Sequence, residues 1–206
     1  MTQHRPEDLD DLEIDALTEL VNLGVSRAAL SLAGMVGEEV LLTVPAISTV
    51  APEQAAEMIG GARVGELVAV EQAFAGDFAG RALLIFPHAS SLELVRAVAG
   101  GKPESQEIED LAPEALCETG NILLQACLST IANMLNRTIG VTVPQLLRGR
   151  ARDLFPRAAK GVVVFIYINF SLRGRRVRGY VALLLDVPTL ASLKGLLAEY
   201  IVRETE

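Results

Sequence analysis

Two stretches of the chain decide its fold: IDALTELVNLGVSRAALSLAGMV at residues 14–36 and EALCETGNILLQACLSTIANML at residues 114–135. Each stretch contains the first three residues of a four-residue pattern: an acid, a Glu four positions later and an Asn three positions after the Glu. The fourth residue is a Pro 23 positions after the Asn. The two sets lie 99 residues apart and are Asp15, Glu19, Asn22 and Pro45, then Glu114, Glu118, Asn121 and Pro144. Because there are only two copies at so long a period, the pattern predicts duplication into pseudo-symmetric halves rather than a solenoid.

Both stretches have the periodicity of amphipathic helices, which we expect over residues 9–36 and 111–136. At about 100° per residue, the apolar side chains of each helix fall on one arc. A narrow polar stripe lies opposite, formed by Asp15, Glu19, Asn22 and Ser26 in the first helix and by Glu114, Glu118, Asn121 and Gln125 in the second. Such a stripe is usually only the solvated face of a surface helix. Here apolar residues border the stripes and suit a docking surface: Leu12, Leu23, Leu30 and Ile122.

The remaining elements follow the same order in each half. Short β-like runs at 40–45 and 139–144 end in Pro45 and Pro144, which cannot donate to a strand ladder. Short helices are expected next, at 52–59 and about 145–151. Strand pairs are expected at 64–74 with 79–87 and at 161–171 with 177–186, and closing helices at 89–99 and 187–203.

These elements predict one α+β domain over residues 1–206. It consists of two α-β-(α)-β-β-α repeats, about 9–99 and 111–203, joined by a linker at 100–110. Half a chain offers a small sheet with one apolar face, which is poorly stable alone. We therefore expect the halves to form one antiparallel-rich sheet with the two long helices together on one face.

Composition restricts the kind of partner and the compartment. Half of the residues are hydrophobic and 21% are charged, so a substantial core can form. The formal net charge of −8 argues against nucleic-acid binding, which relies on Lys and Arg. Cys117 and Cys127 lie about 15 Å apart along one predicted helix, too far for a disulfide. The acidic start is no signal peptide, and no apolar run approaches the roughly 20 residues of a membrane span. We expect a cytoplasmic monomer that binds neither membranes nor nucleic acid.

The common catalytic motifs are absent: the chain has no GxGxxG, no P-loop, no nucleophile elbow and no metal-spaced cluster. His4 and His88 are expected to be structural or solvated. The doubled polar stripe therefore remains as the candidate site. Glu and Asn three apart on a helix project side by side. The carboxylate can pair with a partner's Lys or Arg, and the carboxamide can hold a water molecule.

The doubled pattern resembles that of the CheC family of chemotaxis phosphatases, relatives of CheX and FliY. The family carries Asp/Ser-x3-Glu-x2-Asn-x22-Pro on two long surface helices, and the resemblance extends over nearly the whole chain. Two positions depart from it. Val21 stands where a Gly commonly precedes the motif Asn, as Gly120 does in the second copy, and Glu114 stands where the family has Asp or Ser. We expect the second site to dominate, because it keeps Gly120.

The resemblance implies a phosphatase that acts on the phosphoaspartate of a CheY-type response regulator. Asn22 and Asn121 would align the attacking water, Glu19 and Glu118 would pair with a receiver Lys, and Asp15 and Glu114 would support docking. The receiver would supply Mg²⁺, so no cofactor of the chain's own is expected.

The resemblance also implies a CheD-type deamidase as a second partner. One alternative is a non-catalytic module that sequesters the phosphorylated regulator or such a deamidase. Another is a component of the flagellar switch, as in FliY. FliY-type proteins carry an additional C-terminal switch domain, whereas this sequence ends just after its last predicted helix, so we do not expect that role.

Overall fold

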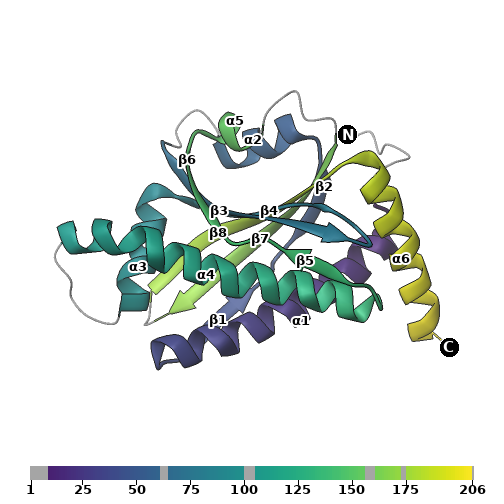
Figure 1. Ribbon diagram of the computed structural model, residues 1–206, viewed down its shortest axis with the longest axis horizontal. Helices are drawn as coiled ribbons and strands as arrows, with labels where there is room; N and C mark the ends of the chain where they lie inside the picture. The colour runs from purple at the N-terminus through teal and green to yellow at the C-terminus, as the bar shows by residue number, and fades with distance from the viewer. Residues whose placement is uncertain (1–8, 61–64, 100–104, 156–160, 173–174, 206) are drawn as a thin grey trace.

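The computed structural model describes residues 9–60, 65–99, 105–155, 161–172 and 175–205 (Figure 1). Its helices are α1 (Asp11–Val36), α2 (Pro52–Gly60), α3 (His88–Ala99), α4 (Ser105–Met134), α5 (Ala151–Leu154) and α6 (Val187–Thr205). Its strands are β1 (Val40–Thr43), β2 (Ile47–Val50), β3 (Leu67–Gly76), β4 (Gly80–Pro87), β5 (Ile139–Val141), β6 (Gln145–Gly149), β7 (Val162–Leu172) and β8 (Arg175–Leu185). The predicted α+β class is confirmed.

The strands form one antiparallel sheet in the order β1-β7-β8-β4-β3-β5, with β2 also paired to β7 and β6 to β3. The register is the same at both edges. Phe74 of β3 pairs with Val141, and Phe170, 96 positions later on β7, pairs with Leu42. In the middle, Leu83 of β4 pairs with Ala182 of β8. Residues of β3 and β7 that are 96 positions apart therefore occupy matching places in the sheet.

The sheet lies between two layers of helices (Figure 1). On one face, α1, α3, α4 and α6 cover the main core, which is rich in Leu, Val and Ile. On the other face, α2 and α5 cover a smaller core that contains Ala55, Leu154, Phe155 and Phe165. The two long helices lie together on the same face, as the sequence predicted.

Helices α1 and α4 run side by side and approach closely at one glycine (Figure 1). A Cβ at Gly24 would lie 2.7 Å from the Cα of Cys127, and real Cβ atoms essentially never come so near a backbone atom. One turn further along, Arg27 Nη1 donates to Thr130 Oγ1 at 3.1 Å. The separation of the two helices is therefore set by the missing side chain of Gly24.

The start of α1 is fixed by a capping box. Asp10 Oδ1 accepts from the Glu13 amide at 2.9 Å, and Glu13 Oε2 accepts from the Asp10 amide at 2.8 Å. Glu13 also forms an ion pair with Lys194 of α6 at 3.4 Å. The box satisfies N–H groups at the helix end and the ion pair joins α1 to α6.

The structure corrects two predictions within the halves. Residues 145–151 are not a helix: strand β6 occupies 145–149 and α5 begins at Ala151. Strand β2 also precedes α2, so each half is α-β-β-α-β-β-α. Both extra strands pair with long neighbours, β2 with β7 and β6 with β3, and these tertiary hydrogen bonds override the weak local pattern.

The predicted linker at 100–110 is also shorter than expected. Helix α4 begins at Ser105, and residues 100–104 lie outside the described ranges. Ile108 and Ala112, four positions apart, are both buried in the main core. Their burial stabilises the additional N-terminal turns of α4 although Pro113 interrupts its hydrogen-bond ladder.

Replacing Gly24 tests the close packing of α1 and α4. We expect Gly24→Ala to lower the free energy of unfolding by about 1–3 kcal/mol, because the new methyl group meets backbone that cannot move aside easily. Gly34→Ala is the matched control, since its Cβ would meet nothing within 4 Å. This control should stabilise the protein by roughly 0.4–1 kcal/mol, measured by urea denaturation. Equal stabilities of the two variants would contradict the close approach.

Candidate functional site

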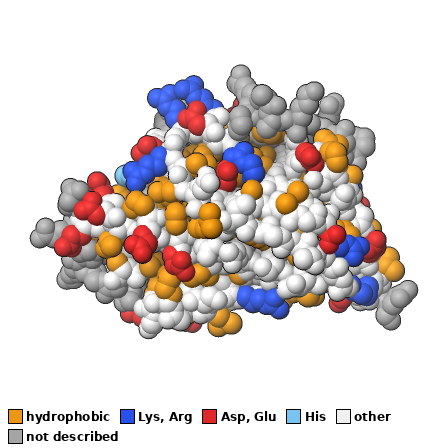
Figure 2. All heavy atoms as spheres, in the orientation of Figure 1, with side chains coloured by type: hydrophobic (Ala, Val, Ile, Leu, Met, Phe, Trp, Pro, Cys, Tyr) orange, Lys and Arg blue, Asp and Glu red, His pale blue; other side chains and the backbone are white. Residues whose placement is uncertain are grey.

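The second polar stripe, from Glu114 to Gln125, lies along the middle of α4. Glu114 and Glu118 are exposed, whereas Asn121 is half-buried where the helix passes over the sheet. Figure 2 shows acidic and hydrophobic side chains interspersed over this part of the molecule. The stripe is therefore a mixed surface, with its carboxylates in solvent and its carboxamide partly covered.

The carbonyl oxygen of Asn121 accepts two hydrogen bonds. Gln125 Nε2, one turn later on α4, donates to Oδ1 at 2.7 Å. Gln72 Nε2, on strand β3, donates to the same atom at 3.0 Å and to the Thr142 carbonyl at 2.8 Å. The sequence predicted Gln125 as part of the stripe, but it gave no sign of Gln72.

Gly120 allows α4 to lie close to β3. A Cβ at Gly120 would be 2.6 Å from Cγ1 of Val70. Val70 is itself buried in the main core, two residues before Gln72. The glycine therefore brings Asn121 within hydrogen-bonding distance of the sheet.

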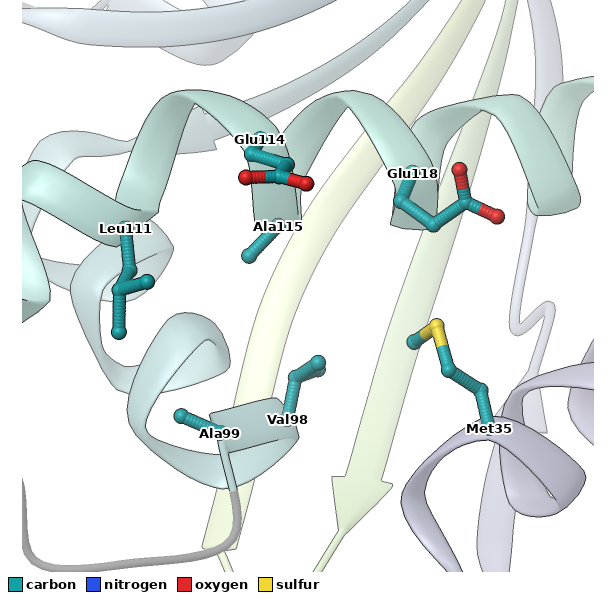
Figure 3. Close-up of a pocket in the computed structure, with 7 residues that line it drawn as sticks. All are labelled: Met35, Val98, Ala99, Leu111, Glu114, Ala115 and Glu118. Atoms are coloured by element: carbon teal, nitrogen blue, oxygen red, sulfur yellow. The ribbon is translucent and has the colours of Figure 1, made fainter.

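An open hollow of about 440 Å³ lies beside the two glutamates of α4 (Figure 3). Leu111, Glu114, Ala115 and Glu118 line it from α4, Val98 and Ala99 from α3, and Met35 from α1. Its floor is apolar, and both carboxylates lie at its α4 wall. Such a surface can receive an apolar side chain of a partner next to a cationic one.

The first stripe, on α1, has a different environment. Asp15, Glu19 and Asn22 are all exposed. Val21 is fully buried where the second half has Gly120. Ser26 Oγ donates to the backbone carbonyl of Asn22 at 2.8 Å. Within the described residues, the Asn22 carboxamide itself has no hydrogen-bond partner.

Helix α6 lies beside the first stripe and extends further than α3 does beside the second. Burial, together with the nearby carboxylates of Glu19 and Glu204, raises the pKa of the Tyr200 phenol. The Arg203 guanidinium lies 5.4 Å from the Tyr200 ring centroid and donates to the Met134 carbonyl. Tyr200 thus lies near Glu19, whereas Val98 and Ala99 at the end of α3 line the hollow beside Glu118.

The predicted apolar border of the first stripe is exposed. Leu12 is 66% exposed, Leu23 42% and Leu30 76%, while Ile122 in the second half is partly buried. Large side chains so placed on one helix are a feature of docking surfaces. The apolar border is therefore exposed beside the first stripe and partly buried beside the second.

Of the two cysteines, Cys127 is buried and Cys117 is half-buried. Burial raises the pKa of the Cys127 thiol to about 12, so this group is a neutral thiol at physiological pH. Cys117 and Cys127 are both free, and His88 begins α3. In the part of the chain that the structure describes, there is no group of three or more His, Cys, Asp or Glu placed to hold a metal ion. The same part contains no helix long and apolar enough to cross a membrane.

Comparison with known proteins gives two informative sequence relatives. CheC1 of Halobacterium salinarum is 28% identical over 149 residues, which cover 71% of this chain and 74% of that protein. The CheY-P phosphatase CheC of Bacillus subtilis is 26% identical over 139 residues, covering 65% of this chain and 65% of that protein. No protein-family model matches the sequence.

Solved structures share the fold. FliY of Thermotoga maritima has a TM-score of 0.75 at 19% identity, covering 93% of this chain and 98% of that chain. A chain of the CheX–CheY–BeF3–Mg²⁺ complex of Borrelia burgdorferi has a TM-score of 0.52 at 14% identity, covering 82% and 99%.

The fold and the doubled helical stripe are those of a protein similar to the chemotaxis proteins CheC, CheX and FliY. The sequence relatives and the structural neighbours point to the same group of proteins, which this chain resembles.

The close approach of α4 to β3 can be tested at Gly120. We expect Gly120→Ala to lower the free energy of unfolding by about 1–3 kcal/mol, because its methyl group overlaps the Val70 side chain. In a Val70→Ala background the same substitution should cost less, since both Cγ atoms of Val70 are gone and only its Cβ, 2.7 Å from the new methyl position, still overlaps. Urea denaturation of the unmodified protein, the two single variants and the double variant gives the coupling energy between positions 70 and 120. Additive losses would show that Val70 does not limit the position of α4.

Proposed function

We propose that this protein hydrolyses the phosphoaspartate of a CheY-type response regulator in the cytoplasm. The observation that carries the proposal is the placement of Glu118 and Asn121 one turn apart on α4, with Glu118 lining an open hollow. The Bacillus subtilis relative is named for CheY-P phosphatase activity, and the Borrelia neighbour comes from a complex that contains CheY. Both support a receiver domain as the partner.

In the proposed mechanism a carboxamide positions the nucleophile. A water molecule attacks phosphorus in line, the bond between phosphorus and the aspartyl oxygen breaks, and inorganic phosphate leaves with the carboxylate restored. Asn121, and Asn22 in the other half, hold this water. The acyl phosphate is a good leaving group, and the receiver contributes Mg²⁺ and a Lys around the phosphoryl group. Positioning is then the main contribution that the phosphatase has to make.

The carboxylates set how the receiver docks. Glu118 and Glu19 pair with the receiver Lys, and Glu114 and Asp15 lie one turn earlier at the edge of the contact. The hollow beside Glu114 and Glu118 receives an apolar side chain of the receiver. The exposed Leu12, Leu23 and Leu30 extend the contact along α1.

The same proposal includes the origin of the two sites. The matched registers at the two edges of the sheet support duplication of one ancestral half. The chain then offers two docking faces, and the hollow and Gly120 favour the second. A monomer is expected, and a CheD-type deamidase remains the predicted second partner from the family resemblance.

Removing both carboxamides tests the mechanism. We expect Asn22→Ala/Asn121→Ala to lower the rate of phosphate release from a phosphorylated receiver by about 100-fold, as losing a positioned group at a transition state commonly does. Asn133→Ala is the matched control, because Asn133 is an exposed Asn of α4 outside the stripe. A double variant as fast as the control would overturn the mechanism. Tight binding without accelerated release in the unmodified protein would instead indicate a sequestering module.

Removing one charge tests docking separately from chemistry. In an Asn22→Ala background, we expect Glu118→Gln to raise KM roughly fivefold, the equivalent of about 1 kcal/mol, with kcat little changed. The effect should shrink as salt is added, because the pair is screened. Glu109→Gln, at an exposed acid of α4 before the stripe, should change neither constant. A loss confined to kcat would assign Glu118 to the chemical step instead.

A further inference from the structure

Gln72 is a buried polar side chain on the face of β3 that otherwise carries the buried apolar residues Val68, Val70 and Phe74. It is 0% exposed and lies on β3, between the buried residues Val70 and Phe74. A primary amide in such a place costs free energy unless its polar atoms are hydrogen-bonded. Both hydrogens of Nε2 are used, one toward the Thr142 carbonyl and one toward Asn121 Oδ1.

The backbone determines which way round the two amides lie. The Thr142 carbonyl can only accept, so the NH₂ end of Gln72, and not its oxygen, must face it. The second hydrogen of that NH₂ group then needs an acceptor, which is the carbonyl end of Asn121. Asn121 is thereby held with its oxygen toward the sheet, and its own NH₂ group is the end left for a partner.

Gln72 also carries a cost that packing alone does not explain. Its Oε1 is buried and has no hydrogen-bond partner among the described residues. An unsatisfied buried acceptor costs about 1–3 kcal/mol. The matching position of β7, 96 residues later, holds Ile168, which is equally buried. An aliphatic side chain therefore fits this place in the sheet without that cost.

We propose that Gln72 is a positioning residue of the second site, which orients the carboxamide of Asn121 so that its Nδ2 donates to the attacking water. This inference rests on the proposed function and extends it to a residue of the sheet. The donated hydrogen bond occupies one lone pair of the water and leaves the other free to attack phosphorus. Gln125 donates to the same oxygen from the exposed side, so the carbonyl of Asn121 is held from two directions. Asn22 has Ile168 at the corresponding place and is not held in this way.

Kinetics of Gln72→Met test the proposal, since Met has a similar length and shape but no amide. In an Asn22→Ala background, we expect Gln72→Met to lower kcat about tenfold with KM unchanged, less than the roughly 100-fold cost of a 1 Å misplacement. Ile168→Met, at the matching position of β7, should leave both constants unchanged. In an Asn121→Ala background, Gln72→Met should cause no further loss. An unchanged kcat for Gln72→Met in the Asn22→Ala background would overturn the proposal. So would a further tenfold loss when Gln72→Met is added to Asn121→Ala.

A second measurement is independent of activity. NMR relaxation of the Asn121 side-chain NH₂ group reports how firmly its orientation is held. We expect a high order parameter in the unmodified protein and a clear fall in Gln72→Met, with thermal stability retained. An order parameter that does not change would overturn the positioning role. If the protein proved not to hydrolyse a phosphorylated receiver, the proposed function would fail, and this measurement would still decide whether Gln72 orients Asn121.

Discussion

The close contact of α1 with α4 determines how the two halves of the molecule are arranged. Because Gly24 has no side chain, the two helices approach so closely that a Cβ at this position would overlap the backbone of Cys127. The capping box and the ion pair with Lys194 fix where α1 begins. Both helices can then cover one face of a single sheet. Their polar stripes are left on the outer side of the same layer, where a partner can reach them.

From this shared framework the two halves diverge through a few side chains. Gly120 lowers α4 onto β3 and brings Asn121 to Gln72, whereas the buried Val21 and Ile168 offer Asn22 neither the same approach nor a donor. Tyr200 of α6 lies near Glu19, while Val98 and Ala99 of α3 line the hollow beside Glu118. The two copies of the pattern thus differ in their neighbours. The second copy has both an oriented carboxamide and a hollow that can receive a side chain of the receiver.

The sequence alone predicted the long helices, the four long strands and the exposed acids, because each has a strong periodic signal. It missed β2 and β6, which are short and depend on hydrogen bonds to β7 and β3. It also placed the start of α4 too late, since only tertiary burial of Ile108 and Ala112 supports that turn. Gln72 could not be found at all, because the adjacent Glu71 and Gln72 in this strand do not reveal which side chain Gln72 contacts.

Turnover by the unmodified protein is the decisive test of whether it hydrolyses a phosphorylated receiver. The measurement is phosphate release from a purified, phosphorylated CheY-type receiver, present in large excess over this protein, with Mg²⁺ in the buffer. We expect each molecule of this protein to release many phosphates, well above the receiver's own rate of loss. Phosphate release at the receiver's own rate, with the two proteins merely bound together, would contradict it.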